Sequence, residues 1–136
     1  MSEGPVEFFS KEWCEAATEL WNRVATPLFV DPDNYNYKLE WRTTDGRVNQ
    51  MIADHAKAVD WWVGKTVPDE EIEFIVEASE ENYKKVADGK LDPVGAVAAK
   101  RVHLKKGPMA ALIKEANAFK TWMEHWGEIN TRWSVD

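Results

Sequence analysis

The stretch from Tyr35 to Thr44 strongly constrains the fold, because apolar and polar side chains alternate along it. One set of alternate positions holds large apolar residues: Tyr35, Tyr37, Leu39 and Trp41. The other set is polar: Asn36, Lys38, Glu40 and Arg42. Successive side chains of a strand point to opposite faces, so this pattern predicts a strand that is half buried. A strand of this kind needs neighbouring strands and an apolar cover to be stable.

Further strands are predicted at 47–54, 56–64 and 71–79. Asp45-Gly46 is a hairpin signal between the first two strands. Four strands in succession with short connections predict an antiparallel meander that is polar on one side. A fifth strand is predicted where Val102 and Leu104 alternate with Arg101, His103 and Lys105.

Residues 5–25 are predicted to form an amphipathic helix, which starts either with Pro5 at its first position or with Ser10 as its N-cap. Ser79 and Asp92 are predicted to cap two short helices, the second of which consists mainly of small residues. A long last helix is predicted from Gly107-Pro108 to Trp133. Its apolar stripe follows steps of three and four: Met109, Leu112, Ala116, Phe119, Trp122 or Met123, Trp126, Ile129 and Trp133.

This order of elements predicts an α+β fold, with a five-stranded, mostly antiparallel sheet covered by helices and an extended C-terminal helix. The 136 residues are expected to form a single domain, 1–136, with a core at about 6–118 and a helical extension at 119–133. No internal repeat divides the chain.

Composition and charge exclude several functions. The chain carries 17 basic and 24 acidic residues, a net charge of −7, which argues against a nucleic-acid partner. Its one cysteine, Cys14, excludes an intramolecular disulfide and a site with several cysteine ligands. The N-terminus shows no signal peptide, and no apolar stretch approaches the length of a membrane span. We therefore expect a cytoplasmic protein.

No catalytic or metal-binding constellation is visible. His55, His103 and His125 share no ligand-like spacing, and there is no Gly-x-Ser-x-Gly motif. We expect no catalytic residue, no metal and no cofactor, and hence a protein that is not an enzyme. The basic run 100–106 is expected to form a polar face of the sheet or to make transient contact with a membrane surface.

The region 83–114 resembles the sterol carrier protein 2 family. The matching positions follow that family's order of short helix, Gly-Lys-Leu-Asp-Pro, small-residue helix, strand and Gly-x-Met: Gly89, Lys90, Leu91, Asp92, Pro93, Ala96, Val102, Leu104, Gly107, Met109 and Leu112. A glycine that the family often carries before the fifth strand is replaced by Ala99 or Lys100. The resemblance implies an apolar tunnel that holds sterols, fatty acids or fatty acyl chains, and it implies no catalytic residue.

The ligand is expected to contact large apolar side chains on the inward-facing stripes. These are Trp13, Leu20, Leu39, Trp41, Phe74, Val76, Val97, Met109, Leu112 and Trp122. The expected role is non-catalytic lipid binding and transport.

The eight tryptophans leave an alternative open. They can form a solid core, line a cavity, or make a homodimer interface, where tryptophan is enriched. The competing interpretation is therefore a dimerisation or interaction module of the same fold, whose cavity is filled by side chains and which carries no lipid.

Overall fold

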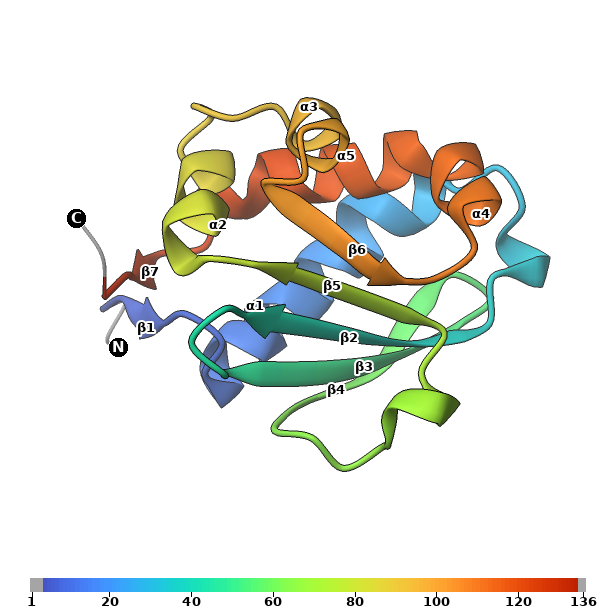
Figure 1. The fold of residues 1–136 in the computed structure, drawn as a ribbon, viewed down its shortest axis with the longest axis horizontal. Helices are drawn as coiled ribbons and strands as arrows, with labels where there is room; N and C mark the ends of the chain where they lie inside the picture. Colours follow the sequence, from blue (N-terminus) through green and yellow to red (C-terminus); the bar gives the residue numbers. More distant parts are fainter. Residues whose placement is uncertain (1–3, 135–136) are drawn as a thin grey trace.

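A computed structural model describes residues 4–134, and its centre is one five-stranded sheet with helices packed against one face (Figure 1). The strands are β2 (Tyr37–Thr43), β3 (Val48–Asp54), β4 (Lys57–Val63), β5 (Phe74–Ala78) and β6 (Val102–Lys106). Their order across the sheet is β4-β3-β2-β5-β6. The predicted α+β class and the five strands are confirmed.

Strands β2, β3 and β4 form two consecutive antiparallel hairpins. Gly46 adopts a φ of 96° in the first turn, as its hairpin signal predicts. His55 and Ala56 have φ of 52° and 66° in the second turn. Positive φ at both central positions matches the twist of a tight hairpin, although neither residue is glycine or asparagine.

The prediction of a four-stranded meander is wrong, because β5 pairs with β2 in parallel and not with β4. The chain between β4 and β5, which includes a 3₁₀ turn at Asp69–Glu71, crosses to the other side of β2 (Figure 1). Gln50 Oε1 accepts the backbone N–H groups of Thr66 and Val67 at 3.0 and 3.1 Å. Lys65 Nζ donates to the Glu40 carboxylate at 2.6 Å. Side chains on the sheet's polar face therefore hold the crossover.

The first helix, α1 (Lys11–Leu20), starts at the second of the two predicted positions, because Ser10 Oγ accepts the backbone N–H of Trp13 at 3.2 Å. It continues as a π-helical segment, Trp21–Ala25, and a 3₁₀ turn, Thr26–Leu28. A second 3₁₀ turn follows at Pro32–Asn34. Before the helix, β1 (Val6–Glu7) pairs in parallel with β7 (Thr131–Arg132), so the first and last strands of the described residues lie side by side.

The short helices are α2 (Glu80–Ala87) and α3 (Pro93–Ala98). Ser79 Oγ accepts the N–H of Asn82 at 3.1 Å, and the Asp92 carboxylate accepts the N–H of Gly95 at 2.8 Å. Both predicted N-caps are therefore confirmed, since each side chain satisfies a free amide of the first turn.

A C-terminal helix is present, but the prediction of one continuous helix to Trp133 is wrong. The segment consists of α4 (Met109–Lys114), α5 (Ala116–Glu124) and a 3₁₀ turn at His125–Glu128. Glu115 separates α4 from α5, and its backbone angles of φ −104° and ψ 18° are not helical. Its carboxylate is buried against the backbone amides of Val30 and Asp31, which turns this residue out of the helical path. Ile129 and Trp133 therefore lie beyond the helix.

Aromatic rings fill the space between α1, α5 and the sheet. The Trp122 ring lies 5.0 Å from Trp21, 5.1 Å from Trp41 and 5.5 Å from Trp61. A second group surrounds Trp13, whose ring lies 5.0 Å from Phe8 and 5.6 Å from Trp126. This half of the molecule is a solid aromatic core.

Candidate functional site

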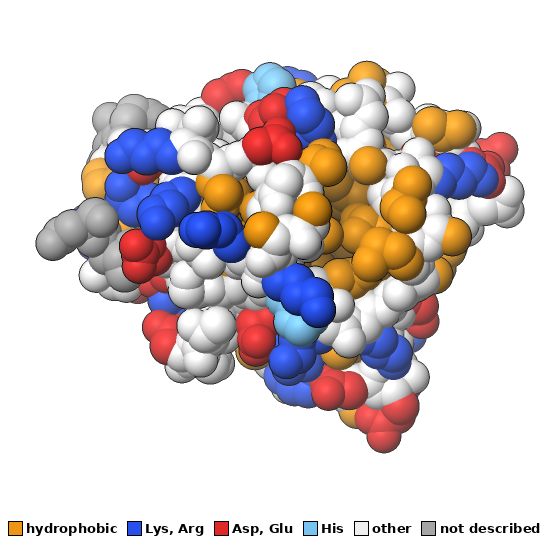
Figure 2. All heavy atoms as spheres, turned by 45° about the horizontal axis from the view of Figure 1, so that its top comes forward, with side chains coloured by type: hydrophobic (Ala, Val, Ile, Leu, Met, Phe, Trp, Pro, Cys, Tyr) orange, Lys and Arg blue, Asp and Glu red, His pale blue; other side chains and the backbone are white. Residues whose placement is uncertain are grey.

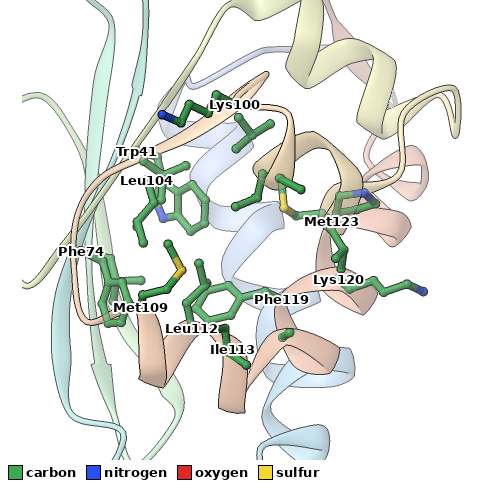
Figure 3. A pocket seen from close by; sticks show the side chains of 18 residues that line it. Trp41, Phe74, Lys100, Leu104, Met109, Leu112, Ile113, Phe119, Lys120 and Met123 are labelled. Carbon is green, nitrogen blue, oxygen red and sulfur yellow. The ribbon is translucent and has the colours of Figure 1, made fainter.

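The other half of the sheet's inner face bounds a cavity of about 430 Å³. It lies between β2, β5 and β6 on one side and α3, α4 and α5 on the other (Figure 3). Eighteen residues line it, and all except Lys100 and Lys120 are apolar. They are Leu39, Trp41, Phe74, Val76, Pro93, Val94, Val97, Ala98, Lys100, Val102, Leu104, Met109, Leu112, Ile113, Ala116, Phe119, Lys120 and Met123.

The sheet wall follows from strand alternation. Leu39 pairs with Phe74 and Trp41 with Val76 in the parallel register of β2 and β5. All four side chains point to the helix-covered face and are buried, from 0% exposed for Leu39 to 9% for Val76. Leu104, opposite Val76 on β6, extends this wall to the edge of the sheet.

The opposite wall is open towards solvent at α3 and α4. No residue of α4 is buried, and Met109 and Ile113 are 50% and 68% exposed although both line the cavity. Val94 on α3 is 49% exposed. Figure 2 shows the result, a hollow with hydrophobic walls that opens on this face of the molecule. We call the exposed apolar residues Val94, Met109 and Ile113 the cavity rim.

Gly107 allows α4 to approach the sheet closely. Its φ is 139°, and a Cβ atom at this position would lie 2.6 Å from Cδ1 of Phe74. Only glycine accepts both this backbone conformation and this contact. The glycine that belongs to the predicted Gly-x-Met motif therefore sets where the cavity ends beside Phe74.

Polar groups at the cavity are few. Figure 3 shows the amino groups of Lys100 and Lys120 at the edge of the cavity, not at its centre. Lys120 Nζ pairs with Glu124 at 2.8 Å, and this pairing raises the pKa of Lys120 above its ordinary value. The indole N–H of Trp41 is buried and has no hydrogen-bond partner within residues 4–134. The site offers apolar contact and almost no fixed charge.

Seven of the ten residues expected to contact ligand lie in the cavity wall: Leu39, Trp41, Phe74, Val76, Val97, Met109 and Leu112. Trp13, Leu20 and Trp122 do not line it. They are at most 1% exposed and belong to the aromatic core, because the apolar stripe of α1 packs on β4 and the C-terminal helices. Trp122 Nε1 donates to the carbonyl of Ala17 at 3.3 Å, which fixes this ring against α1.

The expected list omitted several wall residues, among them Phe119 and Met123 of α5. The helical stripe contained Phe119 and gave Met123 as the alternative to Trp122. Both members of that pair are buried, with Trp122 in the core and Met123 in the cavity wall. The apolar stripe of α5 is therefore divided between two environments, which periodicity does not distinguish.

The histidines lie away from the cavity lining. His55 Nδ1 pairs with Asp54 on an exposed turn, and His125 Nδ1 lies 2.7 Å from the carbonyl oxygen of Thr121. Between residues 4 and 134 no three histidine, cysteine or acidic side chains are grouped to hold a metal ion. In the same part of the chain no helix combines the length and the apolarity that crossing a bilayer requires.

The fold and this cavity together define an α+β domain with a mixed sheet, helices on one face and an apolar hollow between them. Solved structures with this architecture include sterol carrier protein 2. One, of sterol carrier protein 2, superposes with a TM-score of 0.76 at 20% identity over 90% of this chain and 99% of that chain. A conserved hypothetical protein of Thermus thermophilus superposes with a TM-score of 0.73 at 20% identity, over 97% of this chain and 97% of that chain. Apo sterol carrier protein 2 of Yarrowia lipolytica superposes with a TM-score of 0.50 at 11% identity, over 86% of this chain and 99% of that chain.

The chain therefore has the sterol carrier protein 2 fold, and the resemblance inferred from region 83–114 is confirmed at the level of the fold. No protein-family model matches the sequence, and no curated protein matches it. The alternative of a cavity filled by side chains is not favoured, because the indoles pack beside the hollow and leave it open.

Proposed function

We propose that this protein binds and carries a lipid or another hydrophobic small molecule, of the sterol, fatty acid or fatty acyl class, without catalysing a reaction. The observation that carries the proposal is the cavity of about 430 Å³ with almost wholly apolar walls. This volume lies within the range of about 300–1,000 Å³ that small-molecule sites occupy. A cytoplasmic location is part of the proposal and agrees with the free thiol of Cys14.

The energy of binding comes from removing hydrocarbon from water. Each buried methylene group contributes about 0.8 kcal/mol, so about ten of them supply about 8 kcal/mol before the entropy of association is subtracted. The proposed contacts are the seven predicted wall residues named above together with Phe119 and Met123. Trp13, Leu20 and Trp122 support the fold and are not proposed as ligand contacts.

The proposal is tested by titrating delipidated protein with a fluorescent fatty acid and a fluorescent sterol. Native mass spectrometry of the purified protein reports bound lipid and oligomeric state in the same experiment. A dimer without affinity for either probe would favour the interaction module and contradict the proposal.

A cavity-filling variant gives the sharper test. Val97→Phe places a ring in the cavity, and we expect affinity for the probes to fall by at least about tenfold, since overfilled sites force side chains and backbone apart. Val63→Phe makes the same change at a position of β4 that is 50% exposed and outside the cavity lining, and should leave affinity unchanged. Equal affinities in the two variants would show that the probes bind elsewhere.

A further inference from the structure

One of the few buried polar atoms without a partner belongs to the cavity wall. Within residues 4–134 the buried side-chain atoms that lack a hydrogen bond are Tyr35 Oη, Trp41 Nε1, Asn49 Nδ2 and Trp126 Nε1. Of these four residues, Trp41 alone lines the cavity. A buried donor without an acceptor is costly, because it loses its hydrogen bond to water and gains none in return.

Other indoles of the same core have their hydrogen bonds. Trp21 Nε1 donates to the carbonyl of Ala56 at 3.0 Å, and Trp61 Nε1 donates to Asn49 Oδ1 at 2.7 Å. A partner of this kind is usual for a buried indole N–H. The free donor of Trp41 is therefore an exception to how this fold treats its tryptophans, and it occurs beside the cavity.

The side chains of the cavity wall do not supply the missing acceptor. All but two of them are apolar, and the ammonium groups of Lys100 and Lys120 are donors only. The thioethers of Met109 and Met123 are at most weak acceptors. A water molecule is a poor substitute, because a stable buried water needs about two to four polar partners. A good acceptor for Trp41 must therefore come from the molecule that fills the cavity.

The Trp41 ring lies between the cavity and the aromatic core. It is 3% exposed, and its centre is 5.1 Å from that of Trp122. In Figure 3 the ring nitrogen is on the edge of the indole turned towards Leu104 and Met109, two other residues of the wall. Met109 belongs to the cavity rim, and its unbranched, flexible side chain can move aside for a ligand atom. A ligand oxygen reaches this nitrogen from inside the cavity.

The surroundings of the nitrogen favour a neutral acceptor over a carboxylate. Val76, beside Trp41 in the sheet, and Leu104, opposite Val76, are both apolar. An ionised group loses its hydration in such surroundings, and one neutral N–H does not replace it. Lys100 and Lys120 lie at the edge of the cavity, and Lys120 is already paired with Glu124. A carbonyl or hydroxyl oxygen costs far less to bury.

We propose that Trp41 determines ligand specificity, its indole N–H donating a hydrogen bond to a neutral oxygen on the buried part of the ligand. The chemical class selected is an apolar molecule with a hydroxyl, ketone or ester oxygen. A sterol or a fatty acyl ester carries such an oxygen, whereas the carboxylate of a fatty acid stays at the cavity edge. The inference rests on the proposed function, because it assigns a polar contact in the same cavity.

Three probes of similar shape test this contact. Benzylacetone carries a ketone, butylbenzene has a methylene group in place of the carbonyl, and hydrocinnamate has a carboxylate in place of the acetyl group. Each is titrated at neutral pH into delipidated protein whose indole nitrogens are isotope-labelled, and the indole signals are followed by NMR. The Trp41 signal is identified by its absence in Trp41→Phe, which keeps an aromatic ring and removes the N–H.

We expect the Trp41 signal to move downfield with benzylacetone and not with butylbenzene. Because the probes differ in hydrophobicity, the affinity of each is compared between the parent protein and Trp41→Phe. The affinity for benzylacetone should fall about fivefold more than that for butylbenzene, the effect of one neutral hydrogen bond. Trp62→Phe is the matched control, since Trp62 Nε1 is bonded to Gln50 and the cavity lining excludes this residue. It should leave both affinities unchanged.

Equal losses for benzylacetone and butylbenzene in Trp41→Phe overturn the inference, because they assign the effect to ring volume. A Trp41 signal that responds alike to these two probes also overturns it, and this comparison uses the parent protein alone. A downfield shift with hydrocinnamate as large as that with benzylacetone refutes the preference for a neutral oxygen. Binding of butylbenzene with no effect of the ketone contradicts the inference and leaves the proposed function standing. Failure of all three probes and of the fluorescent lipids contradicts both.

Discussion

The buried carboxylate of Glu115 accepts a hydrogen bond from the backbone N–H of Val30 at 2.7 Å, across 85 positions of the sequence. Its second oxygen accepts the N–H of Asp31 at 3.0 Å. The contact ties the loop after α1 to the junction of α4 and α5. Because α4 has no buried residue of its own, this junction is important for holding α4 over the cavity.

Removing the Glu115 carboxylate should destabilise the protein. Glu115→Ala leaves two backbone amides without their acceptor, and hydrogen bonds to a charged group contribute about 1.5–3 kcal/mol. We expect a loss of that size in the free energy of unfolding, measured by urea denaturation. Glu70→Ala removes an exposed carboxylate and is the control. Equal stabilities of the two variants would contradict a structural role for Glu115.

The stability of the crossover should depend on pH through Glu40. Burial raises the pKa of Glu40, but hydrogen bonds from Lys65, Gln50 and Arg42 outweigh burial, so the pKa lies below its ordinary value of 4.5. A carboxyl group whose pKa is lower in the folded than in the unfolded protein stabilises the fold. Its contribution is complete at pH values above the unfolded pKa, and it is lost as the pH falls through the folded pKa.

The variant Glu40→Gln tests this linkage. It should be less stable than the parent protein at neutral pH, and its free energy of unfolding should fall less steeply as the pH is lowered below 4.5. Urea denaturation over a pH series measures both effects. An acid dependence that is identical in the variant and the parent would assign the effect to other carboxylates.

Cys14 should be unreactive in the folded protein. It is 1% exposed, and burial, with a smaller contribution from Glu15, raises the pKa of its thiol to about 12. The thiolate is the reactive form, so labelling by a thiol reagent at neutral pH should be at least about 100-fold slower than in denaturant. Rapid labelling without denaturant would show that α1 opens readily.

Gly107 should tolerate no side chain. In Gly107→Ala the added methyl group meets Phe74 at 2.6 Å and the backbone is strained, so we expect a loss of about 1–3 kcal/mol in urea denaturation. Gly89→Ala, at φ 75° with no atom within 4 Å of the added Cβ, isolates the backbone strain. Similar losses in the two variants would mean that the Phe74 contact relaxes at no cost.

Trp13 should matter for stability and not for ligand binding. Trp13→Phe leaves a void among Phe8, Phe9 and Trp126, which lowers the free energy of unfolding by about 1–3 kcal/mol. Affinity for the fluorescent probes should stay within about twofold of the parent protein, since the cavity lining excludes Trp13. A large loss of affinity in a folded variant would place this indole in the binding site.

The sequence pattern was sufficient to predict those features of the fold that depend only on residues close together along the chain. Alternation assigned Leu39 and Trp41 to the inner face of the sheet, and the type of residue at Ser10, Ser79 and Asp92 predicted the helix caps. Both signals act within a few residues, because a strand repeats every two positions and an N-cap bonds a backbone amide three positions ahead.

Long-range contacts decided the remaining features. Periodicity states which face of a strand is apolar but not which strand lies beside it, so the parallel pairing of β5 with β2 depended on the polar face that holds the crossover. The break at Glu115 depends on amides 84 and 85 positions away. Trp122 and Met123 are both apolar and adjacent in sequence, yet Trp122 fills the core and Met123 lines the cavity. Which of the two environments each side chain enters depends on how α5 packs against α1 and the sheet, and periodicity along one helix does not contain that information.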